Sequence, residues 1–438
     1  MNTRSSSIYN YIDIGFITIL FADLFLKVLP IIPFYMFIMS YVALRCNFYE
    51  KVFMLFIYFP MALGFVLNSL GYSGIGGFPI ILGFVMGIYG VLVGKAKINN
   101  PYQAIVSMLL LLMLFSVSVL STEGGSYAST KLSSTTIAGI RTLSGFVFFF
   151  SNYKNVNTQK VGIFFILLSI LFLRIAIYLY HMPGPLTLID FNFFRVQHVE
   201  FSNEDEQMML IGYQIVGFLC AQGIGYYFLS VKKHVINKSV ITIMLLSTLV
   251  VLYSGSRQAI ITVLFIFSLV ALQQRGRGIS NRVIIPFAIL SFVVYMFISF
   301  TSETGILYSV LQEGYIDGSG RGAWLMSGIE QFTENPFWGV GFGRYFIFGH
   351  YGSYPHNLFV ELLCETGLIG FTFAMFLISR RMIRNRSAFQ AILFLFVAMF
   401  FRFMASAGLN SSIMLFSLVF ALPALKNVQS PKIESINS

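Results

Sequence analysis

Charged residues are scarce in this sequence. They make up 10% of its 438 residues, whereas hydrophobic residues make up 57%. A soluble globular domain usually has about 25% charged residues. The chain therefore lacks the polar side chains that a surface in contact with water needs, and this excludes a soluble globular protein.

Cysteine is also scarce. The three residues Cys46, Cys220 and Cys364 are far apart and lie in or beside apolar segments. Their odd number and their spacing exclude a disulfide framework and a zinc site. A cleavable signal peptide is missing too, because the first apolar stretch contains Asp13 and has no small-residue cleavage site. We expect this stretch to remain as the first membrane helix.

What the sequence has instead is long apolar runs of 17–21 residues, which recur along the whole chain. Each run is long enough to cross about 30 Å of hydrocarbon. They predict an all-α, polytopic transmembrane bundle of about fourteen helices. The expected helices are residues 8–28, 30–46, 50–70, 75–94, 102–121, 133–151, 160–180, 207–230, 238–254, 257–274, 282–300, 357–379, 387–404 and 409–425.

The basic residues are distributed unevenly between the two sides of this predicted bundle. If the arginine-rich loop at 380–386 is cytoplasmic, the cytoplasmic segments hold 19 of the 28 basic residues and 2 of the 17 acidic residues. This is the positive-inside pattern, and it predicts that both termini are cytoplasmic. It also accounts for the net charge of +11, so the basic balance is not evidence for a nucleic-acid partner.

Two connections are much longer than the others, at residues 181–206 and 301–356, and both fall on the non-cytoplasmic side. The expected organisation is therefore helices 1–11 in residues 1–300, a catalytic loop in 301–356, and helices 12–14 with a cytoplasmic tail in 357–438. An amphipathic helix is predicted at 321–334, because the Asn335–Pro336 pair that follows disfavours helix. The aromatic residues and glycines of this loop argue against disorder.

Two arginines are candidates for binding an anion. Arg257 follows a Ser-Gly-Ser turn at the non-cytoplasmic start of the tenth helix, where an arginine is costly unless it is paired or faces water. Arg321 begins the loop helix, where the helix dipole disfavours a cation unless an anion binds at the same place. A guanidinium group forms bidentate hydrogen bonds with phosphate. The simpler alternatives are a membrane-surface anchor for Arg257 and an ion pair with Asp317 for Arg321.

His356 lies between the loop and the twelfth helix, in the sequence Pro-His-Asn. Histidine exchanges a proton near neutral pH, which suits the general base for a sugar hydroxyl. The neighbouring Asn357 is placed to cap the helix. The alternative for His356 is a polar residue of the membrane interface.

Four further residues are weaker candidates. Glu361 and Glu365 share one helix face below the histidine, where they orient it, balance an arginine, or simply pack within the helix. Arg141 and Arg402 lie within apolar spans or at their outer ends and are expected to extend a phosphate site. The remaining histidines lack the spacing of metal ligands, and the glycines of 339–343 do not have the dinucleotide-binding spacing.

Several short motifs follow one another within residues 250–372. They are Ser254-Gly-Ser-Arg257; Arg321-Gly-Ala-Trp-Leu; Phe332; Asn335-Pro-Phe-Trp-Gly339-Val-Gly341-Phe-Gly343; and His356-Asn357, Glu361 and Glu365-Thr-Gly367. Their order and spacing resemble those of the O-antigen ligase/O-antigen polymerase superfamily, which includes the bacterial oligosaccharide repeat-unit polymerases.

The resemblance implies a metal-independent membrane glycosyltransferase of GT-C-like fold, without a cofactor. It would act at the periplasmic face of a bacterial inner membrane on an oligosaccharide carried by undecaprenyl diphosphate. The implied catalytic residues are Arg257, Arg321 and His356: the arginines stabilise the diphosphate leaving group and the histidine deprotonates the acceptor hydroxyl. The residues expected to bind substrate are Arg344, Arg141, Arg402, Glu361 and Asn357. The expected partners are the lipid-linked donor, membrane lipids, a chain-length regulator and a flippase.

Three functions fit these features. The favoured one is a repeat-unit polymerase, whose acceptor is a second lipid-linked repeat unit. The second is a ligase that transfers the glycan to lipid A–core. The third is a flippase or other transporter of lipid-linked oligosaccharides, although such transporters are commonly built from internal repeats and this chain has none.

Overall fold

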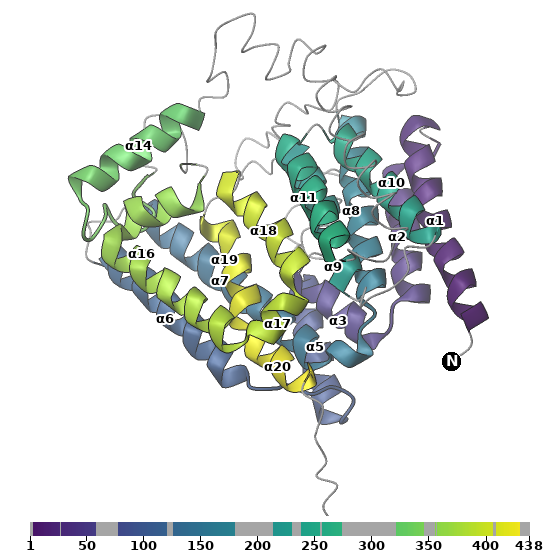
Figure 1. The fold of residues 1–438 in the computed structure, drawn as a ribbon, viewed down its shortest axis with the longest axis horizontal. Coiled ribbons are helices and arrows are strands. Elements are labelled where there is room, and N and C mark those ends of the chain that lie inside the picture. Colours follow the sequence, from purple (N-terminus) through teal and green to yellow (C-terminus); the bar gives the residue numbers. More distant parts are fainter. Residues whose placement is uncertain are drawn as a thin grey trace, which may run out of the picture.

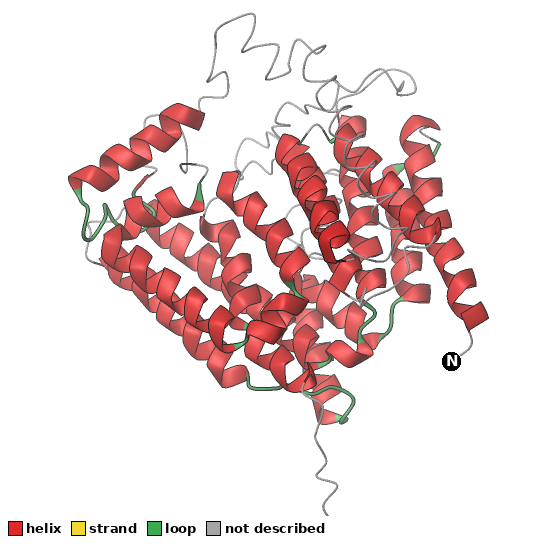
Figure 2. Ribbon diagram, in the orientation of Figure 1, coloured by secondary structure: helices red, strands yellow, loops and turns green. Residues whose placement is uncertain are grey.

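The computed structural model of the protein describes residues 3–26, 28–57, 78–120, 126–179, 213–229, 238–254, 256–273, 321–345, 355, 357–405 and 409–429. Every regular element within these residues is a helix (Figure 2). In chain order the helices are α1 (Thr3–Leu26), α2 (Ile31–Arg45), α3 (Phe48–Ile57), α5 (Phe78–Leu92), α6 (Pro101–Leu120), α7 (Ser126–Ser151), the 3-10 helix η2 (Tyr153–Asn155), α8 (Thr158–Leu179), α9 (Tyr213–Leu229), α10 (Lys238–Tyr253), α11 (Arg257–Gln273), α14 (Arg321–Glu334), α16 (Leu358–Arg384), α17 (Arg386–Ala391), α18 (Leu393–Ala405), α19 (Leu409–Phe420) and α20 (Leu422–Gln429).

Three of the described helices are long and apolar enough to cross a membrane by themselves. They are residues 101–119, 158–175 and 358–384, and shorter apolar helices such as 31–45 and 393–403 accompany them. The helices pack side by side in one bundle (Figure 1). The prediction of an all-α membrane helix bundle is confirmed.

The predicted helices agree with the described ones with few exceptions. Thirteen of the fourteen predicted spans overlap a described helix, and the remaining span, 282–300, lies outside the described residues. The helix in the long loop, α14, has the predicted bounds. Helix α7 begins seven residues before the predicted 133, and the last two predicted spans are each divided into two helices.

Helices α8 and α9 cross at the centre of the bundle with their backbones in contact. A Cβ atom on Gly162 would lie 2.5 Å from the carbonyl oxygen of Gly223, and one on Gly223 would lie 2.7 Å from that of Gly162. Without side chains at the crossing, the two helices approach closely enough for extensive van der Waals contact, as is common between helices in membranes. This crossing lies within the main hydrophobic core.

The two sides of the bundle carry different features. The start of α1 and the helix α20 lie on the lower side in Figure 1, and α14 lies on the upper side. Helices α5 and α17 also lie towards the lower side; the exposed residues Lys95 and Lys97 follow α5 in the chain, and Arg386 begins α17. Below we use "upper side" and "lower side" in this sense.

Helix α16 is bent at Gly367, whose backbone has φ 64° and ψ −173°. Figure 1 shows the two arms that meet at this bend: a short first arm, and a long second arm that runs to the lower side. Only glycine adopts this backbone conformation without strain. The bend therefore has an identifiable cause in the sequence, and it makes the first arm a separate support for the loop that precedes it.

Candidate active site

The three predicted catalytic residues all border parts of the chain that the structure does not describe. Arg257 is the first residue of α11 and Arg321 is the first residue of α14. The side chains of both arginines, and His356 as a whole, lie outside the described residues. The described residues show how the backbone on which these side chains stand is held.

The turn before Arg257 is fixed by hydrogen bonds and by close packing. The backbone N–H of Ser256 donates to the Ser254 Oγ at 3.2 Å, and the N–H of Ala259 donates to the Ser256 Oγ at 3.4 Å. Both serines are buried. On α9, a Cβ atom at Gly217 would lie 2.7 Å from the Cβ of Ser256, so only glycine lets this turn pack so closely. The start of α11 is thus held in one position.

Helix α14 packs along the first arm of α16. Gly328 is the point of closest approach: a Cβ atom there would lie 2.7 Å from Val360 and 3.2 Å from Pro355. Farther along, the thiol of Cys364 donates to the Oε1 of Gln331 at 3.1 Å. Pro355 comes directly before His356 in the chain. The backbone next to His356 therefore lies against α14, two helical turns, or about 10 Å, from Arg321.

Tyr345 closes the segment that follows α14. Its hydroxyl donates to the carbonyl oxygen of Trp324 at 2.8 Å. Burial raises the pKa of Tyr345 to about 12, so the phenol keeps its proton and remains a donor at neutral pH. The segment after α14 thus turns back and is tied to the start of the same helix.

Asn357 caps α16. Its side-chain oxygen accepts from the backbone N–H of Phe359 at 3.0 Å and of Val360 at 3.2 Å, which satisfies two donors at the helix start. The described contacts of Asn357 are those of a cap. The prediction that it also binds substrate stays a prediction.

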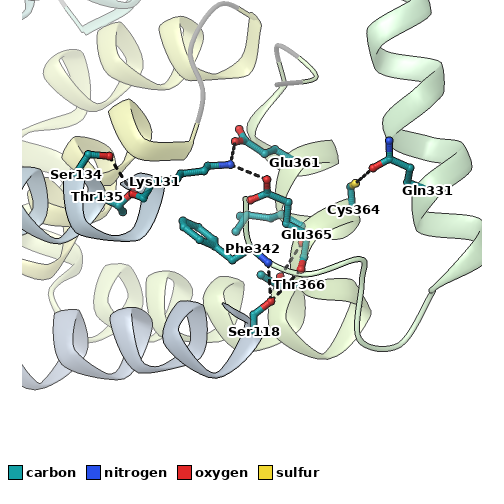
Figure 3. Close-up of polar contacts among 11 residues, drawn as sticks. Ser118, Lys131, Ser134, Thr135, Gln331, Phe342, Glu361, Cys364, Glu365 and Thr366 are labelled. Atoms are coloured by element: carbon teal, nitrogen blue, oxygen red, sulfur yellow. Dashed lines mark hydrogen bonds and ion pairs between the residues drawn. The ribbon is translucent and has the colours of Figure 1, made fainter. Parts of the chain in front are cut away.

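Glu361 and Glu365 follow on the first arm, and both pair with Lys131 of α7 (Figure 3). The Nζ of Lys131 lies 2.8 Å from the Oε1 of Glu361 and 2.6 Å from the Oε1 of Glu365. The glutamate side chains are 0% exposed and the lysine side chain is 5% exposed. We call these three residues the buried charge cluster. The cation that balances the glutamates here is a lysine, whereas the sequence led us to consider an arginine.

The buried charge cluster has more negative than positive charge. With both carboxylates ionised, one ammonium faces two negative groups. Among the described residues, the second oxygen of each carboxylate, Oε2, has no hydrogen-bond partner. Buried charges are normally paired, because leaving one unpaired costs several kcal/mol. One more positive group, or a proton on one carboxylate, would balance the charge of the cluster.

Sequence reasoning missed Lys131. The predicted sixth helix began at 133, so this lysine fell in the connection before it and was not among the candidates. A signal was present, because two glutamates on one face of an apolar helix require a cation. The sequence offers several non-cytoplasmic basic residues for that purpose, and only the folded chain shows which one is used.

The segment after α14, residues 336–343, packs against the bend of α16, and we call it the glycine-rich segment. The N–H groups of Val340 and Gly341 donate to the carbonyl oxygens of Cys364 and Glu365 at 2.8 and 3.1 Å. In return, the N–H of Leu368 donates to the carbonyl of Pro336 at 2.8 Å, and that of Ile369 to the carbonyl of Phe337 at 3.2 Å. The backbone groups that the bend removes from the helix are thus satisfied by the segment itself.

Gly339 and Gly367 allow the backbones of the glycine-rich segment and α16 to approach this closely. A Cβ atom on Gly339 would lie 2.6 Å from the Gly367 nitrogen, and one on Gly367 would overlap the Phe337 carbonyl. Just beyond, the N–H of Phe342 donates to the Oγ of Ser118 on α6 at 2.9 Å, and that Oγ donates to the Glu365 carbonyl at 3.1 Å (Figure 3). The segment, α6 and α16 are therefore joined at one buried hydroxyl.

The remaining predicted substrate-binding residues are spread over the structure. Arg344 is half-buried at the end of the glycine-rich segment, directly after Gly343, whose backbone lies against Ala128 of α7. Arg402 is half-buried near the end of α18, with its guanidinium 5.9 Å from the ring centre of Phe218 on α9. Arg141 is fifteen residues, or about 22 Å, along α7 from its start. No contact described here assigns these arginines to one site.

The start of α14 and the first arm of α16 lie on the same side of the bundle. The end of α14 that carries Arg321 points towards the middle of the upper side, and the first arm of α16 begins on that side too (Figures 1 and 2). Within the described residues, no group of three or more His, Cys, Asp or Glu side chains is placed to hold a metal ion.

Comparison with known proteins identifies this region of the chain. Residues 242–375 match the family model described as O-Antigen ligase. The match includes the turn before Arg257, helix α14, the glycine-rich segment and the first arm of α16. It confirms the resemblance to the O-antigen ligase/O-antigen polymerase superfamily. No curated protein matches the chain.

Proposed function

We propose that this protein is a membrane glycosyltransferase that polymerises oligosaccharide repeat units carried on undecaprenyl diphosphate. The family match supports an enzyme of the O-antigen ligase/polymerase type. The observation that carries the proposal is the close approach of Pro355 to Gly328, because it places the residue before His356 against α14 about 10 Å along the helix from Arg321. An arginine side chain is long enough to act in one cavity with a histidine at that separation.

In the proposed reaction, the hydroxyl oxygen of the acceptor attacks the anomeric carbon of the donor sugar. A new glycosidic bond forms, and the bond between that carbon and the diphosphate oxygen breaks. His356 takes the hydroxyl proton, and undecaprenyl diphosphate leaves. Arg257 and Arg321 stabilise the negative charge that develops on the diphosphate, each with a guanidinium that matches phosphate geometry.

The buried charge cluster supports this mechanism in two ways. It holds the first arm of α16 against α7, and that arm begins after Asn357, the residue that follows His356. When both carboxylates are ionised it also has one negative charge in excess, and that charge favours a histidine that has taken up a proton nearby. Glu361 is one helical turn from Asn357, which places it near that histidine in the proposal.

The site is proposed to face the periplasm. The lower side carries the exposed lysines after α5 and the arginines at the end of α16, which favours a cytoplasmic position for that side. The proposed site, on the upper side, then lies where the oligosaccharide is exposed on the outer leaflet of the inner membrane. Both termini are cytoplasmic in this orientation.

The test uses the purified protein in lipid nanodiscs. Supplied with lipid-linked repeat units alone, it is expected to produce a ladder of longer glycans on the lipid. His356→Ala is expected to abolish the ladder. Arg386→Ala, at the first residue of α17 on the lower side, is the matched surface control and is expected to leave it unchanged.

A ligase is the second candidate, favoured by the description of the matching family. It would give no product from lipid-linked repeat units alone and would transfer glycan when lipid A–core is added. The transporter alternative predicts movement of the lipid-linked oligosaccharide across the membrane without any transfer, in wild type and in His356→Ala alike. Each outcome identifies one of the three functions.

A further inference from the structure

Two aromatic side chains project from the turn after α14. Phe337 is 63% exposed and Trp338 is 74% exposed, although large apolar side chains of soluble regions are seldom left in water together. We call these two residues the aromatic tip. No residue from Asn335 to Phe342 carries a charge.

The aromatic tip is held in place by its backbone. Besides the hydrogen bonds from Leu368 and Ile369 to this turn, the N–H of Gly339 donates to the carbonyl of Asn335 at 2.8 Å and closes it. The close passage of Gly339 and Gly367 leaves no space for the turn to shift. The exposure of the two rings is therefore a property of the folded protein.

The tip is continuous with an apolar face of α16. Leu368 and Ile369, whose N–H groups bond to the turn, are 48% and 46% exposed. Farther along the second arm, Phe376 is 55% exposed. This arm belongs to a helix long and apolar enough to span a membrane, so its exposed apolar face is the face that meets lipid.

We propose that the aromatic tip inserts into the interface of the membrane leaflet on the upper side, with lipid as its binding partner. The tip lies at the bend, where the second arm of α16 begins, and we take this bend as the level at which the second arm enters the leaflet. Tryptophan and other aromatic residues favour that level, because their rings are apolar and the indole N–H reaches the headgroups. The continuous exposed surface from the tip to Phe376 selects lipid over a soluble protein partner.

Such an insertion sets the position of the candidate site relative to the membrane. The tip anchors one end of α14, and Arg321 is at the other end of the same rigid helix. The start of α14 is then held at a constant height above the leaflet. This inference does not depend on the reaction that the protein catalyses.

Tryptophan fluorescence tests the inference directly, because the chain has only two tryptophans, Trp324 and Trp338. The variant Trp324→Phe leaves Trp338 as the only reporter. In nanodiscs with nitroxide-labelled lipids, its emission is expected to be blue-shifted, protected from aqueous iodide, and quenched most by labels near the headgroups. The matched variant Trp338→Phe reports the half-buried Trp324, which is expected to be quenched at least about twofold less by the lipid labels.

A water-like emission wavelength with strong iodide quenching would overturn the inference. So would protection from iodide without quenching by labelled lipid, since that result indicates a second copy of the chain on the tip. If Trp324→Phe does not fold, the wild type is compared with Trp338→Phe, because both keep Trp324. The part of the emission that Trp338→Phe lacks must then be quenched most by labels near the headgroups, and a different depth for that part also contradicts the proposal.

Discussion

The crossing of α8 with α9 and the contact of the glycine-rich segment with α16 are two ways in which glycines let backbones pack closely. At the first, Gly162 and Gly223 bring two complete helices together in the apolar core. At the second, Gly339 and Gly367 let an irregular segment pack against the bend of α16. Backbone hydrogen bonds hold the segment there, and the buried charge cluster holds α16 to α7.

The difference shows where the bundle needs polar contacts between its segments. An unbroken helix satisfies its own backbone groups, so α8 and α9 pack mainly by shape complementarity, with the Ser169 hydroxyl donating to the Val216 carbonyl oxygen at 2.7 Å. A bent helix leaves N–H and C=O groups without partners, and these can be satisfied only by another polar segment. Because the family match falls on the bent region, we expect substitutions there to affect both stability and activity, and those at the α8–α9 crossing to affect stability alone.

Removing the lysine of the buried charge cluster is expected to have the largest effect. Lys131→Met keeps the length of the side chain and leaves Glu361 and Glu365 buried without their cation. We expect a loss of about 3–5 kcal/mol in the free energy of unfolding, because a buried charge without a partner is strongly unfavourable. Denaturant unfolding of the purified protein in detergent measures this loss.

The compensated variant tests the cause. Lys131→Met combined with Glu361→Gln and Glu365→Gln removes the charges together, and it is expected to recover most of the lost stability. If Lys131→Met alone unfolds like the wild type, or if the triple variant is no more stable than the single one, the cluster does not hold α7 to α16 electrostatically.

The bend of α16 is expected to be the next most sensitive place. Gly367→Ala puts a Cβ atom in a glycine-only backbone conformation and against the Phe337 carbonyl, so we expect a loss of about 2–4 kcal/mol. Gly94→Ala is the matched control, because Gly94 has φ 70° with no atom within 4 Å of an added Cβ. It isolates the backbone strain, and its loss should be about half as large. Equal losses for the two variants would show that the segment at Phe337 does not pack against the bend.

The α8–α9 crossing is expected to respond to added volume alone. Gly162→Ala places a methyl group 2.5 Å from the Gly223 carbonyl oxygen and should lower the free energy of unfolding by about 1–3 kcal/mol. Gly15→Ala on α1 is the control: no atom lies within 4 Å of an added Cβ, and it is expected to be neutral or slightly stabilising. If the protein that remains folded with Gly162→Ala has lost its transferase activity, the separation of the two regions is wrong.

The smallest change in stability, with a selective loss of activity, is expected for the two candidate arginines. Arg257→Ala and Arg321→Ala should each lower turnover at least about tenfold, or about 1.4 kcal/mol of transition-state stabilisation. Lysine at either position should restore activity only in part, because it lacks the bidentate geometry. Rates of glycan transfer, with Arg386→Ala as control, measure this. Normal chain-length patterns from both alanine variants at native expression would exclude the proposed role.

The helices were predictable because their cause is local. Apolar runs of membrane length must satisfy their backbone groups within themselves, so each run folds as a helix whatever surrounds it. Helix α14 was predictable for a similar reason, since Asn335–Pro336 ends it. The start of α7 was missed because residues 126–132 are polar and lack the apolar run that marks the other helices.

The candidate site was predictable only as a set of residue types. An arginine at a helix start, a histidine at a loop boundary and two glutamates on one face are visible in the sequence, and so is the motif order that led to the family. The sequence by itself thus determined the membrane bundle and the stretch that matches the family.

Only the tertiary structure decided which groups meet. Lys131 and Glu361 are 230 positions apart, and Ser118 and Phe342 are 224 apart, so no local pattern relates them. The bend at Gly367 likewise depends on the segment at 336–341, which supplies the missing hydrogen bonds. Local propensities form each helix, whereas pairing a buried charge requires the whole fold, because it depends on which distant residue the packing brings within reach.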